Sequence, residues 1–230
     1  MSTSSFSEFL ISLSRKFVPI IAPIYGAEEY VSLDLSSSNK ELDVAVLQQP
    51  HVHHRQLQEF LKASNANVAY GGYLEQRKLY DRSDYFTSEN PDDCRNIHLG
   101  IDLWCEAGTA VLSPLKGKVH SFQENTNFGD YGPTIILEHL EQGRTFYTLY
   151  GHLSRESLSR LEVGQEITVG QEIATLGAPV VNGDYAPHLH FQIIVDIQDY
   201  KGDYPGVASS SQLDFYKMNC PDPNLLLKIY

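Results

Sequence analysis

Two histidines separated by one residue stand in the apolar stretch "APHLHFQII" of residues 186–194. In a strand, side chains two positions apart point to the same face, so His188 and His190 share one face while Leu189 and Phe191 take the other. Two imidazoles on one face suit a pair of metal ligands, or one ligand beside one acid-base group. They equally suit two half-exposed polar residues on a solvated face, so the pair alone does not distinguish a functional site from an ordinary surface.

A second candidate pair lies in "NIHLGID", which carries His98 and Asp102 among apolar residues. On a straight strand their Cα atoms would be roughly 13 Å apart, too far for the two side chains to share one ion. Gly100 lies between them, and glycine tolerates backbone conformations that let a strand curl. We therefore expect both side chains to reach one centre, the alternative being two unrelated polar residues.

The third candidate is His152 in "FYTLYGHLS", at the end of an aromatic-rich segment. Alone it is typical of a histidine that is hydrogen-bonded at a strand end. In combination, however, the order H-x-x-x-D, Tyr-Gly-His-Leu and H-x-H over about residues 95–196 resembles the lysostaphin/LytM-type zinc metallopeptidases. That family has an antiparallel β core, and its members hydrolyse peptide bonds.

The resemblance implies a role for each of these five residues. His98, Asp102 and His190 would hold one Zn²⁺ with water at the fourth position, while His152 and His188 would position and deprotonate the water and stabilise the oxyanion. This agrees with the chemistry of zinc, which accepts nitrogen and oxygen ligands and keeps one open position in catalytic sites. The expected activity is zinc-dependent hydrolysis of a peptide or amide bond.

One residue departs from the family pattern: Gln192 stands where these peptidases commonly have glutamate after the H-x-H-Phe run. Gln192 shares the face of His190, so we expect it beside that ligand, where loss of a carboxylate would weaken metal binding or change the substrate. Two alternatives therefore stay open. One is a catalytically silent zinc-containing binding or regulatory module, and the other is an intracellular hydrolase of a small amide conjugate.

A wider resemblance supports the intracellular setting. The stretches "GGYLEQRKLY", "NIHLGIDLWCEAGTAVLSPLKGKVHSF", "TLYGHLSRESLSRLEVGQ" and "CPDPNLLL" are similar to the central module of fused proteins that join a kinase-like module, a peptidase-like module and an aminotransferase. This resemblance leaves the substrate open.

The elements that must position these residues are strands. Aromatic and β-branched runs alternate with turn residues, and we expect strands within residues 109–115, 117–124, 133–140, 144–153, 165–169, 171–177 and 188–197. The predicted fold class is mainly β: an antiparallel β-sandwich or barrel-sandwich hybrid core with a partly helical N-terminal segment. We place that segment at residues 1–66 and the metallopeptidase-like β domain at residues 67–230. Apolar spacing predicts helices around Phe6–Leu13 and over residues 53–66, the second with Leu57, Phe60 and Leu61 on one face.

The remaining histidines and tyrosines carry weaker expectations. His51, His53 and His54 are expected in a polar loop that enters a helix rather than in a second metal site. A narrower possibility is that this segment, or the Ser-rich stretch before it, lies across the catalytic groove and supplies a ligand in place of water. Tyr150 is the candidate oxyanion donor. The others are expected on a solvated surface (His120, His139) or in the core or groove wall (Trp104, Tyr131, Tyr147).

Composition excludes several classes of function. The formal net charge is −12, so the composition does not indicate the basic surface that nucleic acids need, and we expect no nucleic-acid partner. Three cysteines without a C-x-x-C pair argue against a disulfide framework and a thiolate zinc site, and they favour a reducing compartment. We expect a cytoplasmic protein, although export is not fully excluded. No run approaches the roughly 20 apolar residues of a membrane span, and the oligomeric state is not indicated.

Overall fold

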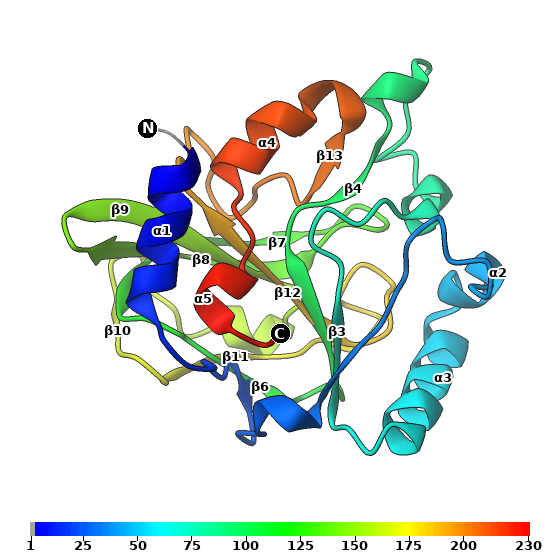
Figure 1. Ribbon diagram of the computed structural model, residues 1–230, viewed down its shortest axis with the longest axis horizontal. Coiled ribbons are helices and arrows are strands. Elements are labelled where there is room, and N and C mark those ends of the chain that lie inside the picture. Colours follow the sequence, from blue (N-terminus) through cyan, green and yellow to red (C-terminus); the bar gives the residue numbers. More distant parts are fainter. Residues whose placement is uncertain (1–2) are drawn as a thin grey trace.

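An eight-stranded sheet forms the centre of the computed structural model, which describes residues 3–230 (Figure 1). All neighbouring strands pair antiparallel except β2 and β3, which are parallel. The predicted mainly antiparallel β fold is therefore confirmed. The strands, in spatial order, are β10 (Glu166–Ile167), β7 (Gly117–Asn125), β8 (Gly132–Glu141), β9 (Arg144–Gly151), β12 (His188–Ile194), β5 (Ile101–Trp104), β3 (Val68–Gly71) and β2 (Tyr30–Ser32).

Two smaller sheets complete the β structure. β1 (Ile21–Ala22), β6 (Ala110–Leu112) and β11 (Glu172–Thr175) form one, and β13 (Val207–Ser209) with β4 (Arg95–His98) forms the other. Inward residues of the three-stranded sheet, such as Val111 and Ile173, share one buried cluster with residues of the large sheet, such as Leu137 and Phe191. Burying apolar side chains between two sheets is the main source of stability in such a fold.

The N-terminal segment packs against the large sheet. The predicted amphipathic helix is present as α1 (Thr3–Leu13), and the rings of Phe6 and Phe9 meet the edge of Phe146 on β9 at centroid distances of 5.9 and 5.6 Å. The chain that follows α1 runs beside α5 (Asn224–Leu227) near the C-terminus, where the amide of Val18 donates to the carbonyl of Leu227 at 2.8 Å (Figure 1). β1 and β2 extend the β structure from the same segment.

The second predicted helix is present as α3 (Pro50–Ala63), preceded by α2 (Val44–Leu47), and Leu57 is buried as expected. The helix begins earlier than the sequence suggested, because Pro50 occupies the first turn, where its missing N–H is no loss. His51, His53 and His54 therefore lie in a helix, and the predicted polar loop was wrong. Figure 1 shows α2 and α3 together at one end of the molecule, beside β3.

Short helical turns and one further helix fill the connections. They are η1 (Ala27–Glu29), η2 (Lys78–Arg82), η3 (Pro91–Asp93), η4 (Arg155–Leu158), η5 (Ser210–Gln212) and α4 (Leu213–Asn219). η4 starts after Ser154, and the hydroxyls of Ser154 and Ser157 connect it to β11 through hydrogen bonds with Thr175. Within residues 3–230, none of the helices combines the length and apolar character that crossing a membrane requires.

Candidate metal centre

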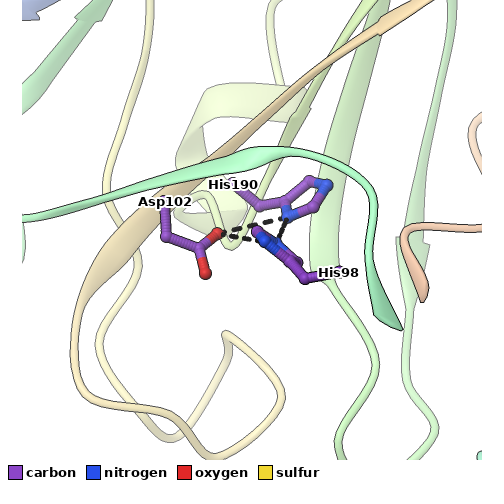
Figure 2. Close-up of side chains that lie close together, drawn as sticks. All are labelled: His98, Asp102 and His190. Atoms are coloured by element: carbon purple, nitrogen blue, oxygen red, sulfur yellow. Dashed lines mark hydrogen bonds and ion pairs between the residues drawn. The ribbon is translucent and has the colours of Figure 1, made fainter. Parts of the chain in front are cut away.

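His98, Asp102 and His190 converge on one point in the interior (Figure 2). Nε2 of His98 lies 2.8 Å from Nδ1 of His190, and Oδ1 of Asp102 lies 3.2 Å from both nitrogens. Each side chain is at most 3% exposed. Ligand atoms bound to a tetrahedral zinc ion at about 2.0–2.2 Å lie roughly 3.4 Å apart, so the observed triangle is only slightly tighter than the metal would make it.

A change of sheet brings His98 and Asp102 together. His98 ends β4, which pairs with β13, whereas Asp102 lies on β5 in the large sheet, directly opposite His190 on β12. Gly100 sits at the turn between them, as expected, but for a different physical reason. Its φ is not positive; instead, a Cβ at this position would lie 2.6 Å from Cε1 of His190 and 2.7 Å from the carbonyl oxygen of Phe191. The glycine supplies space rather than unusual backbone angles.

The hydrogen bonds around the two ligand rings fix which nitrogens carry protons. Nδ1 of His98 lies 2.8 Å from the carbonyl oxygen of Gly72, which can only accept, so this nitrogen donates. The amide nitrogen of Gln192 donates to the carbonyl of Pro205, which turns Oε1 toward Nε2 of His190 at 2.9 Å, so that nitrogen donates too. Both facing nitrogens therefore carry lone pairs.

Two lone pairs and one carboxylate oxygen at this spacing fit a bound cation. Neutral nitrogens 2.8 Å apart repel each other unless a positive charge lies between them, and neutral imidazole with a carboxylate oxygen is a donor set that zinc accepts. The residues present thus fit the metal that the resemblance implies. The expected position of Gln192 beside His190 is confirmed.

The charge on Asp102 is stabilised from several sides. Burial alone would raise the pKa of this carboxyl, but His98 and the guanidinium of Arg77 hold it well below its usual range. Arg77 reaches Oδ2 of Asp102 through Nη1 at 2.6 Å. Burial, reinforced by the nearby positive charge of Arg77, lowers the pKa of His98 to about 3, so this ring is neutral at pH 7 and ready to bind a metal.

His152 and His188 lie beside this triangle as a second pair of rings, with centroids 4.2 Å apart. Nδ1 of His152 donates to the carbonyl of Asn182 at 2.7 Å, and Nδ1 of His188 donates to that of Ala186 at 2.8 Å. Each neutral ring therefore keeps a lone pair on Nε2, and Nε2 of His188 lies 3.9 Å from Oδ1 of Asp102. Burial lowers the pKa of both rings, that of His152 strongly, so both are neutral at pH 7.

Comparison with known proteins agrees with this geometry. Residues 96–202 match the model of peptidase family M23. These residues form an M23 domain. It is a zinc metallopeptidase domain, a hydrolase of peptide bonds, whose His-Asp-His group is the zinc-binding type of site.

Solved structures similar to the M23 domain include two peptidases. The catalytic domain of lysostaphin from Staphylococcus simulans has 27% identity and a TM-score of 0.37, over 53% of this chain and 80% of that chain. A zinc-containing peptidase from Vibrio cholerae has 29% identity and a TM-score of 0.36, over 48% of this chain and 31% of that chain. No curated protein matches significantly.

Aromatic side chains of the M23 domain form the walls around the two rings. Trp104 stacks on His188 with centroids 5.7 Å apart, and Tyr131 lies against His152 and His190 at 5.6 and 5.1 Å. Both residues are buried, as expected for a groove wall.

Two expectations for the M23 domain were wrong. Tyr150 is not near the centre: it is fully buried in the core, where it contacts Thr148 and Phe191, because β9 ends at Gly151 and His152 follows with a φ of 62°. The two-residue alternation therefore does not carry over to His152. His139 is not on the surface either: it is fully buried between the carbonyl of Lys116 and the hydroxyl of Thr148. His120 is only partly exposed, and it bonds Ser121.

Two residues near the centre, His53 and Arg77, were not among the predicted site residues, although the segment of His53 was considered as one that lies across the groove. His53 on α3 is 6% exposed and lines the same cavity as His188. Within the described part of the chain, however, the group of side chains that could hold a metal ion includes none from the N-terminal segment. Arg77 in "GGYLEQRKLY" contacts Asp102 directly. The one sequence signal for Arg77 was its place in a stretch that resembles larger fused proteins.

Proposed function

We propose that His98, Asp102 and His190 hold one zinc ion per chain and that His152 and His188 carry out proton transfer during hydrolysis of a peptide or amide bond. The observation that supports this proposal is that His152 and His188 each keep a free lone pair on Nε2, beside a triangle of three possible ligand atoms. A site that only stored a metal for structural stability would need no second pair of neutral, oriented imidazoles.

When bound, zinc supplies a Lewis acid that polarises the scissile carbonyl and favours ionisation of a water molecule. The chain's own residues orient the reaction around it. The carbonyl oxygens of Asn182 and Ala186 hold the rings of His152 and His188 through Nδ1, which leaves Nε2 of each ring free to accept a proton. The surrounding aromatic walls keep bulk water away, which strengthens every electrostatic interaction inside.

The proton follows a short path. Nε2 of His188 accepts a proton as the water oxygen forms a bond to the carbonyl carbon, and the negative charge of Asp102 at 3.9 Å stabilises the resulting imidazolium. His152 accepts a hydrogen bond from the same water and fixes its direction. The imidazolium then donates its proton to the leaving nitrogen as the C–N bond breaks, which returns both rings to their neutral state.

A second candidate is hydrolysis of a short amide, favoured by the enclosure of the site. Residues 78–95 cover the centre and are tied down by Arg82, which donates to the carbonyl of Asp184 at 2.7 Å, and by Ser83, which donates to that of Phe128 at 2.6 Å. The cavity that remains measures about 50 Å³, room for a few water molecules. A small substrate requires less movement of this cover than a long peptide does. The three free cysteines support a reducing, cytoplasmic setting for such a substrate.

The test is cleavage of amides of graded length by the zinc-loaded protein, from acylated amino acids and dipeptides to decapeptides, with new amino termini detected by mass spectrometry. We expect cleavage that falls by about 10²–10⁴-fold in His152→Ala and His188→Ala. His120→Ala, which removes a histidine outside the site, should behave as the unmodified protein. Preference for the shortest amides would favour the second candidate. Absence of cleavage at every length, with zinc bound, would contradict the proposed hydrolysis.

A further inference from the structure

Arg77 is buried between two carboxylates at the metal centre. It is 3% exposed; Nε donates to Oε2 of Glu75 at 2.5 Å and Nη1 donates to Oδ2 of Asp102 at 2.6 Å. Nη2 has no partner among the described residues. Burying a guanidinium is unfavourable unless it is paired, so the two carboxylates explain how this residue is tolerated here.

The backbone beside Arg77 is shaped to admit it. Gly72 has a φ of 100°, and a Cβ at this position would lie 1.9 Å from Nη2 of Arg77. The carbonyl of the same glycine accepts the hydrogen bond from His98. Glu75 is fixed in turn by the amide of Leu35, which donates to Oε1 at 3.0 Å. Residues 72–77 thus contact two members of the triangle and also connect it to the N-terminal segment.

The contact with Arg77 separates the two oxygens of Asp102. Oδ2 is held by the guanidinium, whereas Oδ1 lies 3.2 Å from the ligand nitrogens of both His98 and His190. A carboxylate with one oxygen held in this way presents only the other to an ion. A chelating carboxylate would occupy two coordination positions, whereas a single-oxygen ligand leaves zinc with three protein ligands and one open position.

We propose that Arg77 is a positioning residue that holds Asp102 as a single-oxygen ligand and so keeps one coordination position of the zinc ion open for the reaction. This inference rests on the proposed function, since it concerns the same zinc centre. It assigns a role to the "GGYLEQRKLY" stretch, which lies before the matched M23 region.

The test compares two substitutions at Arg77 with a matched control. Arg77→Met removes the charge. Arg77→Lys keeps it, but a lysine ammonium falls one bond short of Nη1, so it pairs with Glu75 and releases Asp102. Arg82→Met is the control, because Arg82 stands on the adjacent covering segment of residues 78–95 and pairs with Asp184 rather than with a ligand. The readouts are zinc affinity, by competition with a chromophoric chelator, and the visible spectrum of the cobalt-substituted protein.

For both Arg77 variants we expect zinc affinity to fall about 10–100-fold, the usual effect of losing a residue that orients a ligand. The cobalt bands should weaken severalfold, because a chelating Asp102 raises the coordination number above four. Arg82→Met should match the unmodified protein in both readouts. If Arg77→Met does not fold, the zinc affinity and cobalt spectrum of Arg77→Lys alone test the inference.

Wild-type affinity and spectrum in a folded Arg77→Lys variant would overturn the inference. An equal loss in Arg82→Met would do so as well, since the effect would then belong to the covering segment. Failure of the unmodified protein to bind zinc would instead count against the proposed function, so the two failures are distinguishable.

Discussion

Nε2 of His98 and Nδ1 of His190 face each other at 2.8 Å, and each ring donates its proton from the opposite nitrogen to a carbonyl oxygen. Two lone pairs at this distance are unfavourable without a cation between them. Gly72 and Gln192, the two acceptors, therefore prepare the rings for a metal. This relationship makes the site more than a cluster of polar residues in a core.

Gln192 is expected to set the metal affinity through His190. Gln192→Leu removes the acceptor for the Nε2 proton of His190, and zinc affinity should fall about 10–100-fold. Gln192→Glu keeps an acceptor at the same place and should bind zinc at least as well as Gln192→Leu does. Chelator competition measures both. Equal affinity in the leucine variant and the unmodified protein would show that this hydrogen bond has no part in orienting the ligand.

Gly100→Ala tests whether the glycine at the sheet change is required for space. The added methyl would meet His190 and the Phe191 carbonyl at 2.6–2.7 Å, so the strands must shift. We expect a loss of about 1–3 kcal/mol in the free energy of unfolding, together with weaker zinc binding. Gly26→Ala is the control, since the three atoms nearest to a methyl there all belong to the end of the Glu28 side chain, which can turn away. Urea denaturation with and without zinc measures the stability of both variants. Similar stabilities for Gly100→Ala and Gly26→Ala would contradict the requirement for space at Gly100.

Helix α1 is expected to be an integral part of the core. Phe9 is 6% exposed and packs on Phe146, so Phe9→Ala should lower the free energy of unfolding by about 3 kcal/mol. Ile11 on the same helix is 47% exposed, and Ile11→Ala should change stability little. Chemical denaturation compares the two. If Phe9→Ala is as stable as Ile11→Ala, the helix contributes nothing measurable to the core.

His139 should make the metal-free protein less stable in acid. Burial lowers its pKa from 6.5 to about 4, so the unfolded chain binds the proton more readily than the folded one. The buried neutral ring contributes fully to the free energy of unfolding above about pH 6.5. This contribution, about 3 kcal/mol, is lost as the pH falls toward about 4. His139→Gln should reduce the loss of stability between those pH values by that amount. His51→Gln, at an exposed position, is the control; equal pH dependence in both variants would exclude the effect.

Local patterns in the sequence predicted the strands, whereas the five residues of the centre were assigned from the resemblance of their motifs to a known family. Alternation placed His188 and His190 on one face, and apolar spacing located α1 and α3. Contacts between distant segments were not predictable in this way. Arg77 meets Asp102 through the packing of one loop over another strand, and no spacing rule connects the two positions.

The errors have in common that each concerns where a strand or helix begins or ends, which local periodicity does not define. Tyr150 and His152 are two residues apart, but the strand stops between them and His152 adopts a left-handed backbone conformation. His139 was expected on a solvated surface, but it lies within β8, which continues to Glu141, and its side chain is fully buried. His51, His53 and His54 were expected in a loop that enters a helix, but Pro50 stands in the first turn and the helix includes all three.

The metal content of the purified protein and of two alanine variants tests the central claim most directly. Mass spectrometry should find close to one zinc ion per chain in the unmodified protein and in His188→Ala, and none in His190→Ala. Loss of zinc from His188→Ala as well would contradict the proposed division between ligand and proton carrier. No zinc in the unmodified protein, even after incubation with the ion, would contradict the account of this centre as the site of a metallopeptidase.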